Sequence, residues 1–189
     1  MRQHARDLEG TVAPAPGPWD IHPEGARVEF VARYLEVGRL RGRFRGVTGH
    51  MVVAERPEDS RLEVAIAAAS IDTGIRLLDR VLRTGPFLNV RRHPWLRFRS
   101  REVARTGQTN LRVTGDLTVR TVTRPVTLDV DYRGLAPGAG AARARFAARA
   151  EVDRVAFGFG WSHILGVPLS GRGVRVELEV EAWPGEGPS

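Results

Sequence analysis

The feature that most constrains this chain is a strict alternation of apolar and polar residues, which is clearest in residues 111–133. Apolar side chains occupy every second position there, and Thr, Asp and Arg fill most of the positions between them. A period of two residues is typical of a β-strand with one buried face and one solvent-facing face. Pro125 cannot donate a hydrogen bond to a neighbouring strand, so we expect a turn within 120–125 and an antiparallel pair around it.

The same period recurs along most of the chain, for example in residues 28–34, 62–68 and 174–182. Counting these segments predicts about eight strands or slightly more, and most connections are too short for parallel crossovers. Four glycines within residues 38–49 predict bulges or sharp bends that let a sheet coil and close. We therefore expect an all-β fold, an eight-stranded antiparallel barrel, in a single domain of ordinary length.

Composition at the two ends of the chain predicts the domain bounds. Pro14, Pro16 and Pro18 indicate a flexible leader without regular structure over residues 1–18. We expect the barrel to span residues 19–184 and residues 185–189 to form a flexible tail. The leader lacks the apolar core of a signal peptide, so we expect a cytoplasmic protein.

One segment departs from the strand period. Ile75, Leu78, Asp79, Leu82 and Arg83 have the spacing of three and four residues that is typical of an amphipathic helix. Asp72 or Thr73 is the expected N-cap of this helix. We expect it to be short and to lie over one mouth of the barrel.

The charge of the chain comes from arginine alone. All 29 basic residues are Arg, and with 22 acidic residues the formal net charge is +7. Many of these arginines alternate with apolar residues along predicted strands, which is where the solvent face of a sheet must be polar. We therefore expect no nucleic-acid binding and, at most, transient contact with an anionic membrane surface.

No pattern in the sequence favours catalysis or metal binding. Cysteine is absent, no nucleophile elbow occurs, and the five histidines are dispersed: His4, His22, His50, His93 and His163. We expect no catalytic residue, no metal ligand and no cofactor. Two alternatives stay open. One is an enzyme that pairs His93 or His163 with Asp79 or Asp72, and the other is an interaction module that uses the loop of residues 157–169.

The alternation also predicts which strand residues face the barrel interior. We expect the following to point inward: Phe30, Leu62, Val64, Ile66, Leu96, Phe98, Leu117, Val119, Leu128, Val130, Phe146, Val174, Val176 and Leu178. Such an interior is apolar throughout. Periodicity alone is compatible both with a packed core and with a channel that holds a long hydrocarbon.

Over residues 19–183 the chain resembles the YceI-like family, a lipocalin-like group that binds polyisoprenoid lipids. The resemblance rests on the order and spacing of these motifs: Trp19-Asp20-Ile21-His22, Arg41-Gly42-x-Phe44-x-Gly46, Ser70-Ile71-Asp72-Thr73-Gly74, Pro94-x-x-x-Phe98-x-Ser100, Gly115-Asp116-Leu117-Thr118-Val119, Val122-Thr123-Arg124-Pro125-Val126 and Asp153-Arg154-x-x-Phe157-Gly158. Three positions near the mouth depart from the family pattern, where Val81 replaces His, Pro86 replaces Asp and Thr121 replaces Gly.

The resemblance implies a non-enzymatic lipid binder with an elongated apolar cavity, used for transport or storage, and often a homodimer. The expected ligand is a polyisoprenoid or similar long-chain amphiphile. The expected ligand contacts are the strand residues above other than Val174, to which the helix and loops add Leu78, Leu82, Phe87, Phe157 and Trp161, eighteen residues in all. Head-group contacts are expected at the rim formed by residues 70–95 and 157–169.

Overall fold

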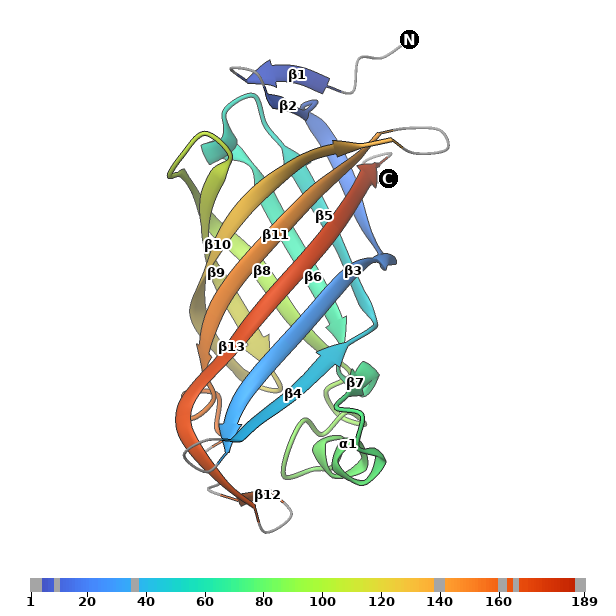
Figure 1. Ribbon diagram of the computed structural model, residues 1–189, viewed down its shortest axis with the longest axis vertical. Coiled ribbons are helices and arrows are strands. Elements are labelled where there is room, and N and C mark those ends of the chain that lie inside the picture. The colour runs from blue at the N-terminus through green and yellow to red at the C-terminus, as the bar shows by residue number, and fades with distance from the viewer. Residues whose placement is uncertain are drawn as a thin grey trace.

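The computed structural model describes residues 5–8, 11–34, 38–137, 142–159, 163–164 and 167–185, with backbone alone at 5–8, 11–12, 34, 163–164 and 167–169. Its main feature is a tall barrel of steeply tilted strands (Figure 1). Eight strands form the wall: β3 (Gly17–Tyr34), β5 (Val47–Val53), β6 (Arg61–Ala67), β8 (Trp95–Arg105), β9 (Asn110–Val119), β10 (Val122–Ala136), β11 (Arg143–Asp153) and β13 (Val167–Pro184). The shorter elements are β1 (Ala5–Leu8), β2 (Thr11–Pro14), β4 (Gly38–Phe44), β7 (Ile71–Asp72), β12 (His163–Ile164) and two single turns, η1 (Pro57–Asp59) and η2 (Ala68–Ser70).

The barrel is closed because its first and last wall strands pair with each other. Neighbours follow the order β13-β11-β10-β9-β8-β6-β5-β3, and β13 then pairs antiparallel with β3, from Trp19↔Pro184 to Tyr34↔Leu169. All these pairings are antiparallel. The predicted eight-stranded antiparallel barrel is therefore confirmed.

β4 and β5 together run along the single long strand β3. β5 pairs with its first part, Gly17↔Val53 to Ile21↔Gly49, and β4 with its last part, Val28↔Phe44 to Tyr34↔Gly38. The break between them falls at residues 45–46 and includes Gly46, within the glycine-rich stretch that predicted a bend. On its other edge, β4 pairs with the short β7, which leads into the helix.

The predicted hairpin of residues 111–133 is β9 paired with β10, and the turn consists of Arg120 and Thr121. We expected Pro125 to lie in the turn, and this was wrong. Pro125 lies inside β10, opposite Asp116. The pairing of β10 with its other neighbour, β11, reaches only from Asp129 toward the far end of β10. A proline is tolerated here because no strand lies on that side to require its missing N–H.

The structure places strands before Trp19, where the prolines led us to expect none. β1 and β2 form a separate hairpin, and β3 already begins at Gly17. Pro14 and Pro18 stand at strand ends, where few ladder bonds are required. Ala13 is only 3% exposed and packs in one cluster with Trp19 and Tyr132. The domain bounds of 19–184 and the flexibility of the leader stay predictions.

The expected helix is present as α1 (Arg76–Leu82), beside the barrel end that also holds β7 (Figure 1). Its N-cap is Ile75 and not Asp72 or Thr73, and no side chain caps it. Asp72 instead binds arginines of the wall, while Thr73 donates from both its N–H and its hydroxyl to Asp79 Oδ1. Among the described residues, no helix has the length and apolar content needed to span a bilayer.

We predict that Gly115→Ala lowers the free energy of unfolding by about 1–3 kcal/mol, the usual cost of overpacking. A Cβ at Gly115 would overlap the carbonyl oxygen of Arg99 and the ring of Phe98, because β8 and β9 approach closely there. Gly85→Ala is the matched control, since a Cβ at Gly85 meets nothing within 4 Å. Urea unfolding checks both, and equal stability of the two variants would contradict this account of the close approach.

Candidate ligand-binding cavity

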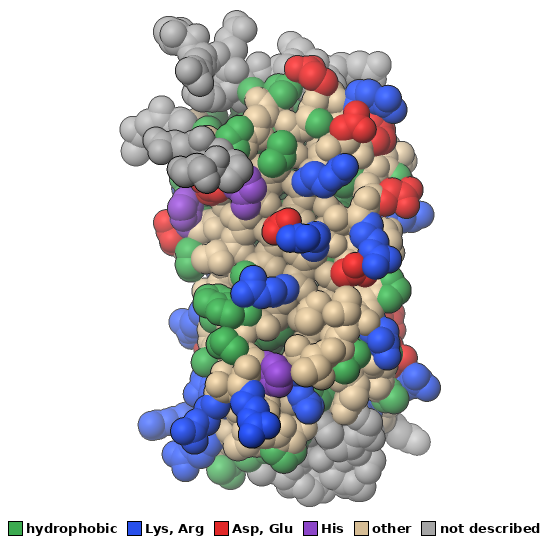
Figure 2. Space-filling model, turned by 180° about the vertical axis from the view of Figure 1, so that it is seen from behind, with side chains coloured by type: hydrophobic (Ala, Val, Ile, Leu, Met, Phe, Trp, Pro, Cys, Tyr) green, Lys and Arg blue, Asp and Glu red, His purple; other side chains and the backbone are tan. Residues whose placement is uncertain are grey.

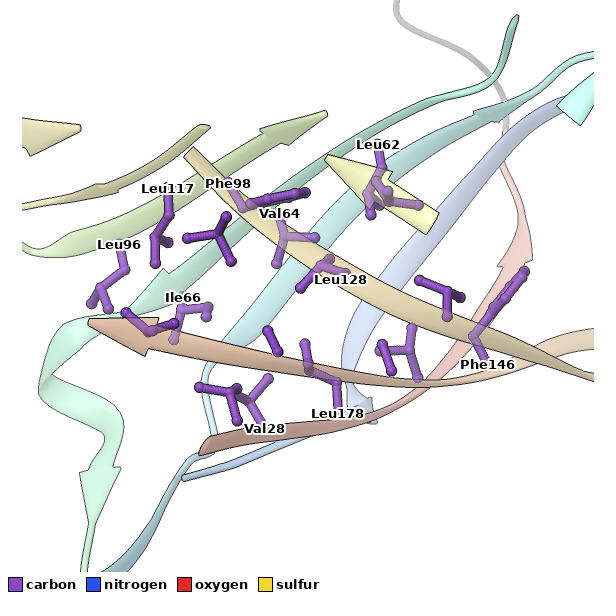
Figure 3. Close-up of a pocket in the computed structure, with 18 of the residues that line it drawn as sticks. Val28, Leu62, Val64, Ile66, Leu96, Phe98, Leu117, Leu128, Phe146 and Leu178 are labelled. Carbon is purple, nitrogen blue, oxygen red and sulfur yellow. The ribbon is translucent and has the colours of Figure 1, made fainter. Parts of the chain in front are cut away.

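A cavity of about 400 Å³ runs inside the barrel and is lined by alternate residues of all eight wall strands. Its volume is that of a site for a small organic molecule. Figure 3 shows how the side chains converge, with Val64 and Phe98 on one side of the interior and Leu178 and Phe146 on the other. The interior is thus hollow along its length and not completely filled by its own side chains.

Sixteen of the eighteen residues predicted to contact ligand line this cavity: Phe30, Leu62, Val64, Ile66, Leu82, Phe87, Leu96, Phe98, Leu117, Val119, Leu128, Val130, Phe146, Phe157, Val176 and Leu178. Leu78 is buried in the same apolar cluster as Ile71 and Leu88 but does not itself line the cavity. Trp161 lies outside the described residues. Contact of these side chains with a ligand stays a prediction.

Several lining residues were not among those predicted, and most of them continue the same alternation. Val28 precedes Phe30 on β3, while Val113 and Val126 extend the inward rows of β9 and β10. Their signal was present in the sequence, in the two-residue period itself. Leu40 and Phe44 also line the cavity, but they stand in the glycine-rich stretch that we interpreted only as a bend.

The barrel has two ends, which are formed by different connections between the strands. The α1 end comprises the connections of residues 68–94, 120–121 and 154–159, and the far end comprises those of residues 54–60 and 106–109. The two ends differ in how the cavity terminates.

At the α1 end, buried apolar side chains close the cavity. Leu82, Leu88 and Phe157 are each less than 10% exposed and belong to one core cluster, against which Phe87 and Phe159 pack. The turn after β11 places Phe157, because Asp153 Oδ1 accepts hydrogen bonds from the N–H groups of residues 155 and 156. The Leu88 N–H donates to the Leu82 carbonyl oxygen at 3.0 Å, which folds the chain after α1 back over the opening.

At the far end, the lining becomes polar and reaches the protein surface. The residues concerned are Ser60, Arg61, Arg105, Gln108 and Thr109, of which the two arginines and Gln108 are exposed. We expected polar head-group contacts at the opposite rim, in residues 70–95 and 157–169. The described lining residues within those two ranges are all apolar, and the charged lining residue at that end is Arg154, just before the second range.

The structure does not bring the candidate acid and base residues together in the cavity. No Asp, Glu or His is among its described lining residues. Asp79 is buried outside the cavity, and its Oδ1 accepts from the Thr73 hydroxyl at 2.7 Å. His93 does not line the cavity, and the side chain of His163 lies outside the described residues. Tyr132 contributes a titratable hydroxyl to the described lining, and burial raises the pKa of Tyr132 to about 12.

An ion-pair cluster fastens the segment before α1 to the wall. Asp72 Oδ2 lies 2.7 Å from Arg45 Nη2 and 3.1 Å from Arg43 Nη2, and Asp72 Oδ1 accepts from the Gly74 N–H. The hydrogen bonds from Arg45, Gly74 and Arg43 lower the pKa of Asp72 to about 2. The carboxylate is therefore held in its charged form by its partners.

We predict that Asp72→Asn is less stable than the natural protein at pH 6 and that the difference shrinks as pH falls. The lowered pKa means that this stabilisation is present above pH 3.8, the ordinary value, and is lost as pH falls toward about 2. Urea unfolding at pH 6 and near pH 2 measures the difference. Asp59→Asn, whose carboxylate lies 3.9 Å from Arg56, is the control with the weaker pair. A difference that did not change with pH would contradict the role of the Asp72 charge.

A closed antiparallel barrel of eight strands with an apolar interior is the architecture of lipocalin-like binding proteins. Residues 19–182 match the model of the YceI-like domain. The chain therefore belongs to the YceI-like family, as its motifs indicated.

Curated relatives of the chain bear the name UPF0312 protein. The one from Azotobacter vinelandii is 34% identical over 116 residues, which are 61% of this chain and 60% of that protein. The one from Serratia proteamaculans is 34% identical over 141 residues, which are 74% of this chain and 73% of that protein. The matched part of the chain thus spans less than two thirds of the length of the Azotobacter relative.

Solved structures share the fold at low sequence identity. BcnA of Burkholderia cenocepacia has a TM-score of 0.72 and 20% identity, and the match covers 85% of this chain and 98% of BcnA. A polyisoprenoid binding domain from Saccharophagus degradans, implicated in plant cell wall breakdown, has a TM-score of 0.69 and 11% identity, covering 90% of this chain and 100% of that one. These likenesses establish the barrel architecture.

Proposed function

We propose that the protein binds one long-chain isoprenoid or a similar amphiphilic lipid inside the barrel, for transport or storage. The observation that carries this proposal is the hollow, continuous and almost wholly apolar lining of the cavity. A packed core would leave no such volume between facing side chains. The polyisoprenoid binding named for the Saccharophagus domain agrees with the proposal, although 11% identity supports only a common fold.

The energetics favour a long ligand over a short one. A chain of about fifteen carbons, or about three isoprene units, gains about 12 kcal/mol at about 0.8 kcal/mol per buried CH₂. Association costs at least about 4 kcal/mol in lost freedom of motion. The remaining 8 kcal/mol or so corresponds to a Kd near 1 μM, whereas a ligand of half that length would bind at most very weakly.

The asymmetry of the lining supports one direction for the ligand in the cavity. A polar head group buried among Leu82, Leu88 and Phe157 would lose its hydrogen bonds to water without replacement. At the far end Ser60 and Arg105 provide polar surroundings next to solvent. We therefore place the tail toward the α1 end and the head group at the far end.

We predict that Ala148→Phe weakens binding of geranylgeraniol at least tenfold, because Ala148 lines the cavity and a phenyl ring there would occupy the lumen. Ala147→Phe is the matched control, since the next residue of β11 faces the opposite side of the sheet. Isothermal titration calorimetry gives the two affinities and the negative heat-capacity change of apolar burial. Equal affinities of the two variants would refute lumen binding.

Occupancy in the cell is tested by mild purification, native mass spectrometry and lipid extraction. We expect a mass increment that extracts as a long-chain amphiphile. A barrel that is always empty and also fails to take up geranylgeraniol would overturn the proposal. The homodimer stays a prediction, as does the interaction module, in whose loop of residues 157–169 only the side chains of residues 157–159 are described. The alternative of catalysis at His93 or His163 gains no support from the lining.

A further inference from the structure

The outer surface of the α1 end combines exposed apolar side chains with arginines that outnumber the acidic side chains of its described connections. Ile75 is 52% exposed, Leu77 59% and Trp95 41%. These are three of the four large apolar side chains that are exposed in the described part of the chain, and the fourth, Val52, lies near the far end of β5.

The exposed apolar residues follow from how α1 packs. Leu78 and Leu82 face the barrel and are buried, so the intervening side of this short helix points to solvent. Leu77 stands on that side, next to Arg76 and Arg80, which are also exposed. Isolated exposed apolar residues are ordinary, but two on the α1 segment and a third at the start of β8, where that segment ends, mark an interaction surface.

Charge is distributed unequally between the two ends. The described connections of the α1 end carry two acidic residues, Asp72 and Asp79, and seven arginines: Arg76, Arg80, Arg83, Arg91, Arg92, Arg120 and Arg154. Both carboxylates are already engaged, Asp72 by Arg43 and Arg45, and Asp79 by Thr73. The described connections of this end therefore carry an excess of positive charge.

The far end is close to neutral, because the net acidic charge of its connections is balanced by Arg61 and Arg105 at the adjoining strand ends. Residues 54–60 contain Glu55, Glu58 and Asp59 against Arg56, and residues 106–109 contain no charged side chain. Figure 2 shows the contrast on one face, where basic side chains gather around the lower end on the side of α1 and the acidic ones lie mostly above it. The barrel is thus electrostatically polar along its axis.

The basic surface continues from the connections onto the wall. Arg33 of β3 and Arg39 of β4 are directly opposite each other in the ladder, and both are exposed. Like charges in that position repel, and within the described residues neither arginine forms an ion pair. Such a pair is relieved when an anionic surface approaches it.

We propose that the α1 end docks onto an anionic lipid bilayer, with Ile75, Leu77 and Trp95 at the level of the head groups and the arginines against the phosphates. Aliphatic and Trp side chains among basic residues match the apolar and anionic layers of a membrane surface. A nucleic acid offers the charge but no apolar layer, so the exposed Ile75 and Leu77 favour the bilayer. The residues of this docking surface were identified from their exposure and charge alone, so the proposal does not require a ligand in the cavity.

Docking in this orientation has a consequence that rests on the proposed function. The bilayer would face the apolar cluster of Leu82, Leu88 and Phe157, which closes the tail end of the cavity. Only this short apolar barrier would then separate the hydrocarbon of the membrane from the lumen.

The test is sedimentation of the full chain with vesicles of phosphatidylcholine, alone or mixed with phosphatidylglycerol, at low and high salt. We expect binding at least tenfold stronger with phosphatidylglycerol, and loss of most of it at high salt, because exposed charges are screened. Ile75→Ser with Leu77→Ser, and separately Arg91→Glu with Arg92→Glu, should each weaken binding at least tenfold. Val52→Ser and Arg56→Glu are the matched controls at the far end and should leave it unchanged.

All the substituted side chains are exposed, and circular dichroism with thermal unfolding verifies that each variant folds. Equal binding to both kinds of vesicle, equal loss in the far-end controls, or binding of RNA without binding of vesicles would overturn the docking surface. Titration with geranylgeraniol measures ligand affinity of the cavity independently of vesicle binding, since none of the substituted residues lines the cavity. A variant that loses vesicle binding but keeps geranylgeraniol binding supports the docking surface and leaves the function of the lumen intact.

Discussion

Every property of this molecule depends on the pairing of β3 with β13, which converts a long sheet into a tube. Closure removes both sheet edges and forces alternate side chains of each strand into a common interior. Because those side chains are almost all apolar, the inside of the tube is a nonpolar compartment that water does not fill favourably. Most arginines lie on the outer face of the barrel, and those that line the cavity, Arg61, Arg105 and Arg154, lie at its ends. The protein therefore carries a high charge while the middle of the lumen stays apolar.

Fold and lumen were both predictable because one signal, the two-residue period, encodes both. Wherever the period ran without interruption, as in residues 111–133 and 174–182, the strand and its inward face followed directly. Prediction failed where local chemistry outweighed the pattern. Pro125 suggested a turn, but it lies where β10 lacks a second neighbour, and this lack is a property of the assembled sheet.

The polarity of the cavity could not be read from the chain in advance. Arg61 and Arg105 look like any other alternating arginines, yet strand ends and loops bring them to one mouth. Leu78 and Leu82 lie on one face of α1, one helical turn apart, and both are part of the apolar core. Only Leu82 lines the lumen, because Leu78 is one turn earlier in the helix. Sequence periodicity specifies a face, whereas three-dimensional packing specifies depth along it.

The junction of Trp19 with Pro184 also governs how the barrel can form. Its two partners are separated by nearly the whole domain, so the tube cannot close until almost all of the chain is available. Hairpins such as β9–β10 and β8–β9 are local and can form early, but the closing ladder pays the largest loop entropy. Folding should therefore end with a slow zippering of β13 onto β3. Until that step the apolar interior is exposed as an open, curved sheet, the state in which the protein is most exposed to aggregation.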